Sequence, residues 1–132
     1  TDTAAANTLD DYEEGTWTPT IQSGGTVNNV IKAIYTKIGN MVHAHVYMTF
    51  TATNNGSMFA IGGLPFSPIA SQHGGGSVQY MAGFNFSNFS GPLVASNSSF
   101  YFHRRDGTGA PVSNSVFGGT SQYIIVQLQY QI

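Results

Sequence analysis

The sequence predicts a single all-β domain, an antiparallel β-sandwich with a jelly-roll-like architecture. Seven or eight short runs alternate apolar and polar residues at the period of two that a half-buried strand requires. Clusters of Gly, Asn and Ser separate these runs, and no window carries the apolar stripe of an amphipathic helix. With 132 residues, 41% of them hydrophobic, the chain is long enough to bury one core.

The chain has few charged residues, and this excludes some classes of binding partner. Charged residues make up 8% of the sequence and the net charge is -2. The four basic residues, Lys32, Lys37, Arg104 and Arg105, give no footprint for a phosphate backbone, so nucleic acid is not an expected partner. No apolar run approaches the roughly 18 residues of a membrane helix, so membrane insertion is not expected. A neutral polar surface suits contacts with identical subunits or with neutral sugars.

The first residues are expected to lead into the domain rather than to belong to it. Thr1 to Asp10 carry no apolar stripe and are interpreted as a connector from an upstream segment, with the domain spanning residues 11–132. Because the chain begins at Thr1 rather than Met, we expect it to be a piece of a longer polypeptide. Thr16 to Gln22 is the first predicted strand, and Pro19 confines it to an edge or to a strand start.

Two long runs predict the centre of the fold. Gly39-Asn40 joins Val27 to Ile38 and Met41 to Thr51 into a hairpin. The second of these runs, and the last run of the chain, alternate more regularly than any others, and the last is expected to lie centrally in a sheet. Their core-facing residues are Val42, Ala44, Val46, Met48 and Phe50, and Ile124, Val126, Leu128, Tyr130 and Ile132.

Shorter elements are predicted between these two runs. Thr53 to Ser57 is a turn, after which Met58 to Ile61 returns as a short strand. Gln72 to Gly76 is a loop whose glycines indicate either mobility or close approach by other backbone. Ser77 to Phe86 is a strand, and Ser87 to Gly91 is a loop because a three-residue repeat cannot continue a pleat. The strand would turn Val78, Tyr80, Ala82, Phe84 and Phe86 to one face.

A hairpin is also predicted late in the chain. Phe100 and Phe102 alternate with Tyr101 and His103 in its first strand. Arg104 to Gly109 forms its tip, which holds most of the charge of the second half of the chain. Val112 to Phe117 is the returning strand.

Three sequence blocks resemble a known family. Tyr12 to Thr20, Tyr35 to Val42 and Gly63 to Phe66 are similar, in order and spacing, to a domain at the C-terminal ends of phage and prophage tail fibres and tailspikes. The match lies within Leu9 to Phe66, about half of the chain. The resemblance implies a homotrimeric distal domain, mounted on an upstream fibre shaft in the virion, that closes the trimer or touches the host surface.

Three functions follow from this resemblance and the composition. The first is a non-catalytic domain that binds the host cell surface, with a host-surface glycan as its ligand. The alternative is a structural trimerisation cap or virion decoration without a ligand of its own. The remaining one is part of a polysaccharide depolymerase, which would need two carboxylates about 5 to 10 Å apart. Enzymatic activity is not expected, because the acids lie in the first 14 residues except for Asp106.

The ligand-binding candidates are polar loops. Tyr101, His103, Arg104, Arg105 and Asp106 combine aromatic rings with bidentate donors on the predicted hairpin tip. The competing interpretation is a solvated turn with an Arg/Asp pair.

Two further loops are rich in amide and hydroxyl groups, which hydrogen-bond sugars. They contain Asn54 and Asn55, and Asn85 and Asn88. Trp17 could stack on a sugar ring, but the alternative of a buried anchor with a paired N–H is favoured.

His43 and His45 are candidate metal ligands. Their i and i+2 spacing puts both imidazoles on one face of a predicted strand, so three chains around an axis would present six. Such a set of nitrogen ligands suits iron or nickel, and the resemblance adds that fibre tips of related phages hold an axial metal with such pairs. The competing interpretation is a polar surface pair with no transition metal and no cofactor.

Overall fold

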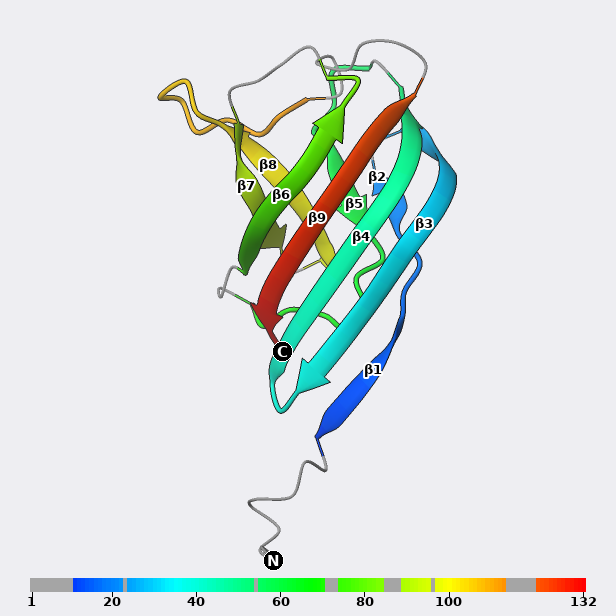
Figure 1. Ribbon diagram of the computed structural model, residues 1–132. Helices are drawn as coiled ribbons and strands as arrows, with labels where there is room; N and C mark the ends of the chain where they lie inside the picture. Colours follow the sequence, from blue (N-terminus) through cyan, green and yellow to red (C-terminus); the bar gives the residue numbers. More distant parts are fainter. Residues whose placement is uncertain are drawn as a thin grey trace, which may run out of the picture.

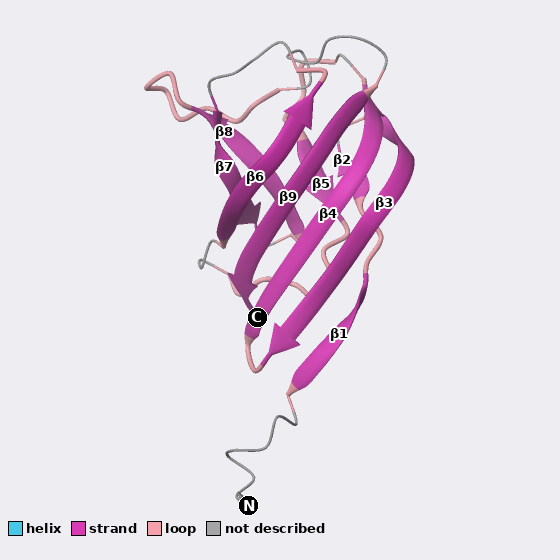
Figure 2. Ribbon diagram, viewed as in Figure 1, coloured by secondary structure: helices cyan, strands magenta, loops and turns pink. Residues whose placement is uncertain are grey.

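The computed structural model describes residues 11–22, 24–53, 55–70, 74–84, 89–95, 97–113 and 121–132. Within these residues the chain is all-β, as expected, and every strand pairs antiparallel with its neighbours (Figure 2). No helix among them has the length and apolar character to cross a membrane.

The described residues form one sheet of nine strands in the order β1-β3-β4-β9-β6-β7-β8-β5-β2. In Figure 1, β3, β4, β9 and β6 lie in front, and β7, β8, β5 and β2 lie behind them. The strands are β1 (Tyr12–Thr16), β2 (Thr20–Gln22), β3 (Gly25–Ile38), β4 (Met41–Ala52), β5 (Ala60–Gly62), β6 (Gly75–Ala82), β7 (Phe89–Ala95), β8 (Ser99–Arg104) and β9 (Gln122–Gln131).

The sheet is curled because its two end strands are neighbours in the sequence. Only Trp17, Thr18 and Pro19 separate β1 from β2, although these strands stand at opposite ends of the strand order. A link of three residues cannot span a flat sheet of nine strands, which lie about 4.8 Å apart. The two ends are therefore brought together, and the inner face of the curled sheet encloses the core.

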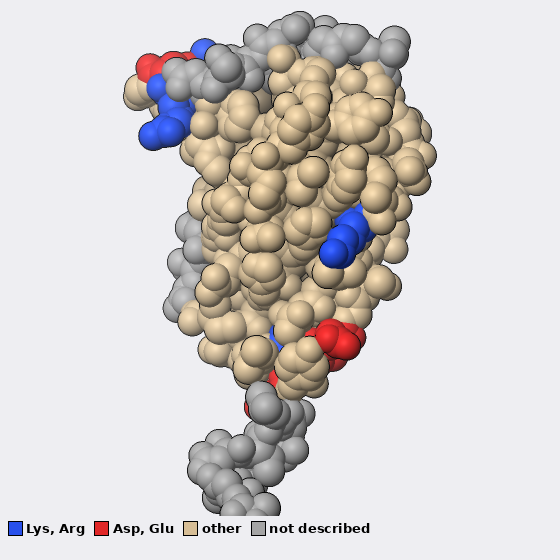
Figure 3. All heavy atoms as spheres, viewed as in Figure 1, with Lys and Arg blue, Asp and Glu red and all other residues tan. Residues whose placement is uncertain are grey.

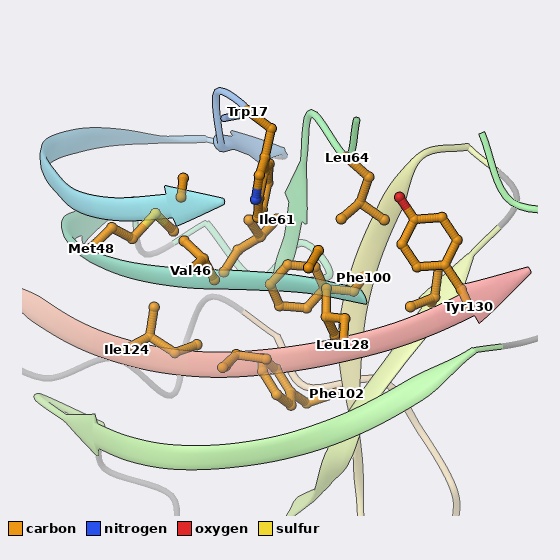
Figure 4. Packing of buried hydrophobic residues seen from close by; sticks show 14 of the residues in the cluster. Trp17, Val46, Met48, Ile61, Leu64, Phe100, Phe102, Ile124, Leu128 and Tyr130 are labelled. Atoms are coloured by element: carbon orange, nitrogen blue, oxygen red, sulfur yellow. The ribbon is translucent and has the colours of Figure 1, made fainter. Parts of the chain in front are cut away.

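The inner faces of β4 and β9 form the centre of the core. The alternation predicted for both strands is confirmed: Val42, Ala44, Val46, Met48 and Phe50 are buried, as are Ile124, Val126, Leu128 and Tyr130. β9 pairs with β4 on one side and with β6 on the other, so its predicted central place is confirmed. Figure 4 shows these side chains meeting residues from the strands behind, among them Ile61, Phe100 and Phe102.

Trp17 anchors the connection between β1 and β2. Its side chain is 7% exposed, and its Nε1–H lies 3.2 Å from both the Ile34 and the His45 carbonyl oxygens. The interpretation of Trp17 as a buried anchor is thus confirmed. The predicted strand from Thr16 to Gln22 is wrong in extent, because β1 starts earlier and residues 17–19 leave the sheet's regular pairing to cross to β2.

The middle of the chain departs most from expectation. β6 includes Gly75 and Gly76, which were expected in a loop, because Gly75 pairs with Gln129 and Gly76 with Leu128 of β9. A register shift between Val78 and Tyr80 inserts an extra residue, so Tyr80 is 52% exposed while Met81 packs on the core. The predicted common face of Val78 and Tyr80 is therefore wrong.

Three other boundaries also differ. The segment from Phe89 to Gly91 belongs to β7 rather than to a loop. A register shift between Phe89 and Pro92 lets the strand accommodate the three-residue repeat. β5 starts at Ala60 and pairs with β8 and β2, not with β4. Val112 and Ser113 contribute backbone hydrogen bonds and an isolated bridge, and the rest of that predicted strand, like the predicted connector Thr1 to Asp10, lies outside the described residues.

Candidate functional site

The predicted hairpin tip is present and lies far from the start of the domain. The Arg104 N–H donates to the Ala110 carbonyl at 2.8 Å, and the Val112 N–H donates to the Phe102 carbonyl at 2.8 Å. These bonds close the hairpin that follows β8. In Figure 1 the tip projects at the upper left, whereas β1 lies at the lower end of the molecule.

Asp106 organises the tip. Its Oδ1 accepts hydrogen bonds from the Thr108 amide at 3.1 Å and the Thr108 hydroxyl at 2.5 Å, and its Oδ2 lies 2.5 Å from Arg104. The Thr108 bonds, with a smaller contribution from Arg104, lower the pKa of the Asp106 carboxyl. Asp106 is thus engaged inside the turn, and the tip is an ordered polar loop with charged groups at its surface (Figure 3).

Tyr101 and His103 lie at the base of this tip. Their ring centroids are 5.0 Å apart with the planes inclined by 51°, and both residues are half-buried. The His103 ring nitrogen Nδ1 contacts the Gly109 carbonyl, which ties the strand to the end of the turn. The structure therefore brings all five tip candidates, Arg105 included, onto one hairpin.

The asparagine candidates are only partly described. The Asn55 side-chain oxygen accepts a hydrogen bond from the Ser57 amide at 3.0 Å, so it shapes its own turn. Asn54, Asn85 and Asn88 lie outside the described residues.

His43 and His45 share the outer face of β4, as predicted. His43 is exposed, and His45 is half-buried with an Nδ1 atom that has no hydrogen-bond partner among the described residues. Burial, and then the charges of Lys32 and His43, lower the pKa of His45 and favour its neutral form. No three His, Asp or Glu side chains come together in the described part of the chain. A metal ion here would need ligands from neighbouring chains, and it stays a prediction.

An open groove of about 600 Å³ lies on the outer face of the sheet, where β4 and β6 begin and β9 ends. A second hollow of about 210 Å³ adjoins it and shares Met41, His43 and Gln129. The lining of the larger groove is Met41, His43, Gly74 to Ser77 and Gln127 to Gln131. Sequence reasoning missed this groove. The alternating Gln residues of the last run were visible, but their place beside the glycines depends on strand register.

The chain was compared with known proteins in three ways. A scan against protein-family models, a search of curated proteins and a search of solved structures each found no match.

Proposed function

We propose that this chain is the non-catalytic distal domain of a phage tail fibre or tailspike, which binds a host-surface glycan as a homotrimer. The observation that supports it best is the opposition of the two ends of the molecule. β1, where an upstream shaft would attach, lies at one end, and the polar tip lies at the other (Figure 1). A shaft joined to β1 would hold the tip outward from the virion, toward the host cell.

The surface of β1 and β3 supports assembly of several copies. Five large hydrophobic side chains on these two strands are 39% to 54% exposed: Tyr12, Val30, Ile31, Ile34 and Ile38. β1 is also an end strand of the sheet, and one of its edges is unpaired among the described residues. Three chains arriving from one shaft would meet first at β1, so a second copy of this chain is the occupant we propose for this surface. A jelly-roll-like sandwich remains the finer prediction for each subunit.

The acids support a role without chemistry. Glu13 accepts a hydrogen bond from the Tyr35 hydroxyl and Glu14 from the Tyr12 hydroxyl, each at 2.6 Å. Asp106 is engaged at the opposite end of the molecule. A depolymerase that paired Asp106 with Glu13 or Glu14 at about 10 Å or less would need a neighbouring subunit, because β1 and the tip lie at opposite ends of the molecule.

Adsorption to host cells tests the proposal. The double variant Tyr101→Ala and Arg104→Ala is expected to abolish binding of the trimer to host cells and to a glycan array. The control is Tyr123→Ala, which removes an exposed tyrosine of β9 that lies outside both the tip and the surface of β1 and β3. Adsorption that is unchanged in the tip variant would refute the proposed placement of the site.

A structural trimerisation cap is the second candidate, and the exposed apolar residues of β1 and β3 favour it equally. Deletion of this domain from the full-length fibre distinguishes the two. If the domain is a cap, the upstream shaft no longer assembles as a trimer. If it is a receptor-binding domain, the shaft still assembles and only adsorption is lost.

A further inference from the structure

We propose that the groove over β4, β9 and β6 is a second binding site, and that its ligand is a neutral saccharide. The ligand class rests on the proposed function, whereas the location does not. The strand ends that line it, the start of β4 and β6 and the end of β9, lie at the lower end of the sheet in Figure 1, away from the hairpin tip.

Strand register brings the polar side chains of the groove together. Gln129 of β9 stands opposite His43 of β4 on one side and opposite Gly75 of β6 on the other. Two residues earlier in β9, on the same face, Gln127 stands opposite Ser77. His43, Ser77 and Gln129 are exposed, so their polar groups are accessible to a ligand.

Gly74, Gly75 and Gly76 line the side of the groove formed by the start of β6, and none of them carries a side chain that could fill it. A Cβ atom on Gly74 would overlap the Gln129 carbonyl oxygen, and one on Gly76 would overlap the Gln127 carbonyl oxygen. Neither position can therefore carry a side chain without movement of β9. A Cβ on Gly75 would meet nothing nearer than the Pro92 carbonyl at 3.5 Å, so Gly75 leaves its space free for a ligand.

The chemistry of the lining selects an uncharged ligand with many hydroxyl groups. The accessible polar groups of the lining are three glutamine amides, the Ser77 hydroxyl and the His43 imidazole, and the lining contains no Asp, Glu, Lys or Arg. Amides both donate and accept hydrogen bonds, as sugar hydroxyls do, and the lining offers no carboxylate, ammonium or guanidinium group to pair with a charged ligand. The volume of about 600 Å³ falls within the range of about 300 to 1,000 Å³ for small-ligand sites.

An extended peptide fits this groove less well. Peptides commonly bind sheets by adding a strand to an open edge. Here β9 is hydrogen-bonded to β4 and β6 on its two sides, so its backbone groups are already paired. Recognition must use side chains, and the side chains present match a saccharide.

Titration of the purified chain with neutral sugars tests the site. Glucose, galactose and N-acetylglucosamine are the probes, with galacturonic acid as a charged comparison, and binding is followed by calorimetry or ligand-observed NMR. Gln129→Ala is expected to raise the dissociation constant about tenfold, as for loss of one well-formed hydrogen bond. Gly75→Leu is expected to block the groove while the fold, checked by circular dichroism, is kept.

Two controls separate this site from the tip. Asn29→Ala removes an exposed amide on the same sheet but outside the groove, and it should bind as the wild type does. The tip variant with Tyr101→Ala and Arg104→Ala should also keep groove binding. The groove proposal is overturned if no neutral sugar binds the wild type, or if Gln129→Ala and Gly75→Leu bind as the wild type does. Failure of the tip placement would show separately, as cell adsorption unaffected by the tip variant.

Discussion

Adjacent glycines in β6 are predicted to respond oppositely to the same substitution. The perturbations are Gly76→Ala and Gly75→Ala. At Gly76 the new Cβ would overlap the Gln127 carbonyl oxygen and lie 2.7 Å from its carbon and 2.9 Å from the Leu128 Cα. Non-bonded carbon atoms prefer about 3.5 to 4.0 Å. The obstructing atoms are all backbone of β9, which β4 also holds in place, so they cannot rotate aside.

The expected magnitudes follow from these contacts. Overpacking typically costs about 1 to 3 kcal/mol, and Gly76→Ala should reach the upper end because backbone must move. At Gly75 the nearest atom is 3.5 Å away, an ordinary contact. A glycine replaced without strain stabilises a protein by about 0.4 to 1 kcal/mol, because the unfolded chain loses conformational freedom. The two variants should therefore differ by about 3.5 to 4 kcal/mol.

Urea unfolding at one fixed protein concentration measures this difference, because an oligomer's midpoint depends on concentration. Trp17 fluorescence and circular dichroism report the transition, and the slopes of wild type and variants should agree. A Gly76→Ala protein within about 0.5 kcal/mol of wild type would refute the close approach of β6 to β9. If Gly75→Ala destabilised the protein as much as Gly76→Ala does, the open space beside Gly75 in the groove would be refuted.

The remaining predictions concern buried polar groups. Trp17→Phe removes the N–H shared by two carbonyls and should destabilise the fold by about 1 to 3 kcal/mol in the same urea assay. Since the pKa of His45 is lowered in the folded chain, the unfolded chain takes up that proton first, and stability should fall as pH drops below about 6.5; thermal melts at pH 7.5 and 5.5 should show a smaller fall for His45→Gln. Burial raises the pKa of Tyr130 to about 12. Unfolded tyrosine ionises near pH 10, so stability should fall between about pH 10 and 12 in the wild type but less in Tyr130→Phe, as measured by urea unfolding at pH 9 and 11.

The sequence predicted best where one strand meets regular partners on both sides. β4 and β9 have one buried face each, so period-two alternation alone located them and their core residues. The prediction for β6 was wrong because an extra residue near Val78 turns Tyr80 outward and Met81 toward the core. Amino-acid composition gives no sign of such a bulge. The strand order could not be predicted for a related reason, since β5 pairs with β2 and β8, which lie far away in the sequence.

The two candidate sites also differ in how well the sequence predicts them. The hairpin tip is local, and turn residues flanked by alternating strands were enough to predict that Tyr101 to Asp106 belong together. The groove is not local, because Gln129, His43 and Gly75 become neighbours only through the registers of two strand pairs. Its recognition required the structure.

The three blocks that carry the family resemblance meet in space. Gly15 leaves room for the Tyr35 ring, since a Cβ there would lie 2.9 Å from the Tyr35 hydroxyl, and Tyr35 in turn packs edge-on against Phe66 at 5.2 Å. A side chain on Gly63, whose φ is +84°, would collide with the Thr18 carbonyl oxygen. These contacts close the curled sheet near the link between β1 and β2. Because these residues are engaged in closing the fold, ligand specificity has to be tested elsewhere, at the tip and at Gln129.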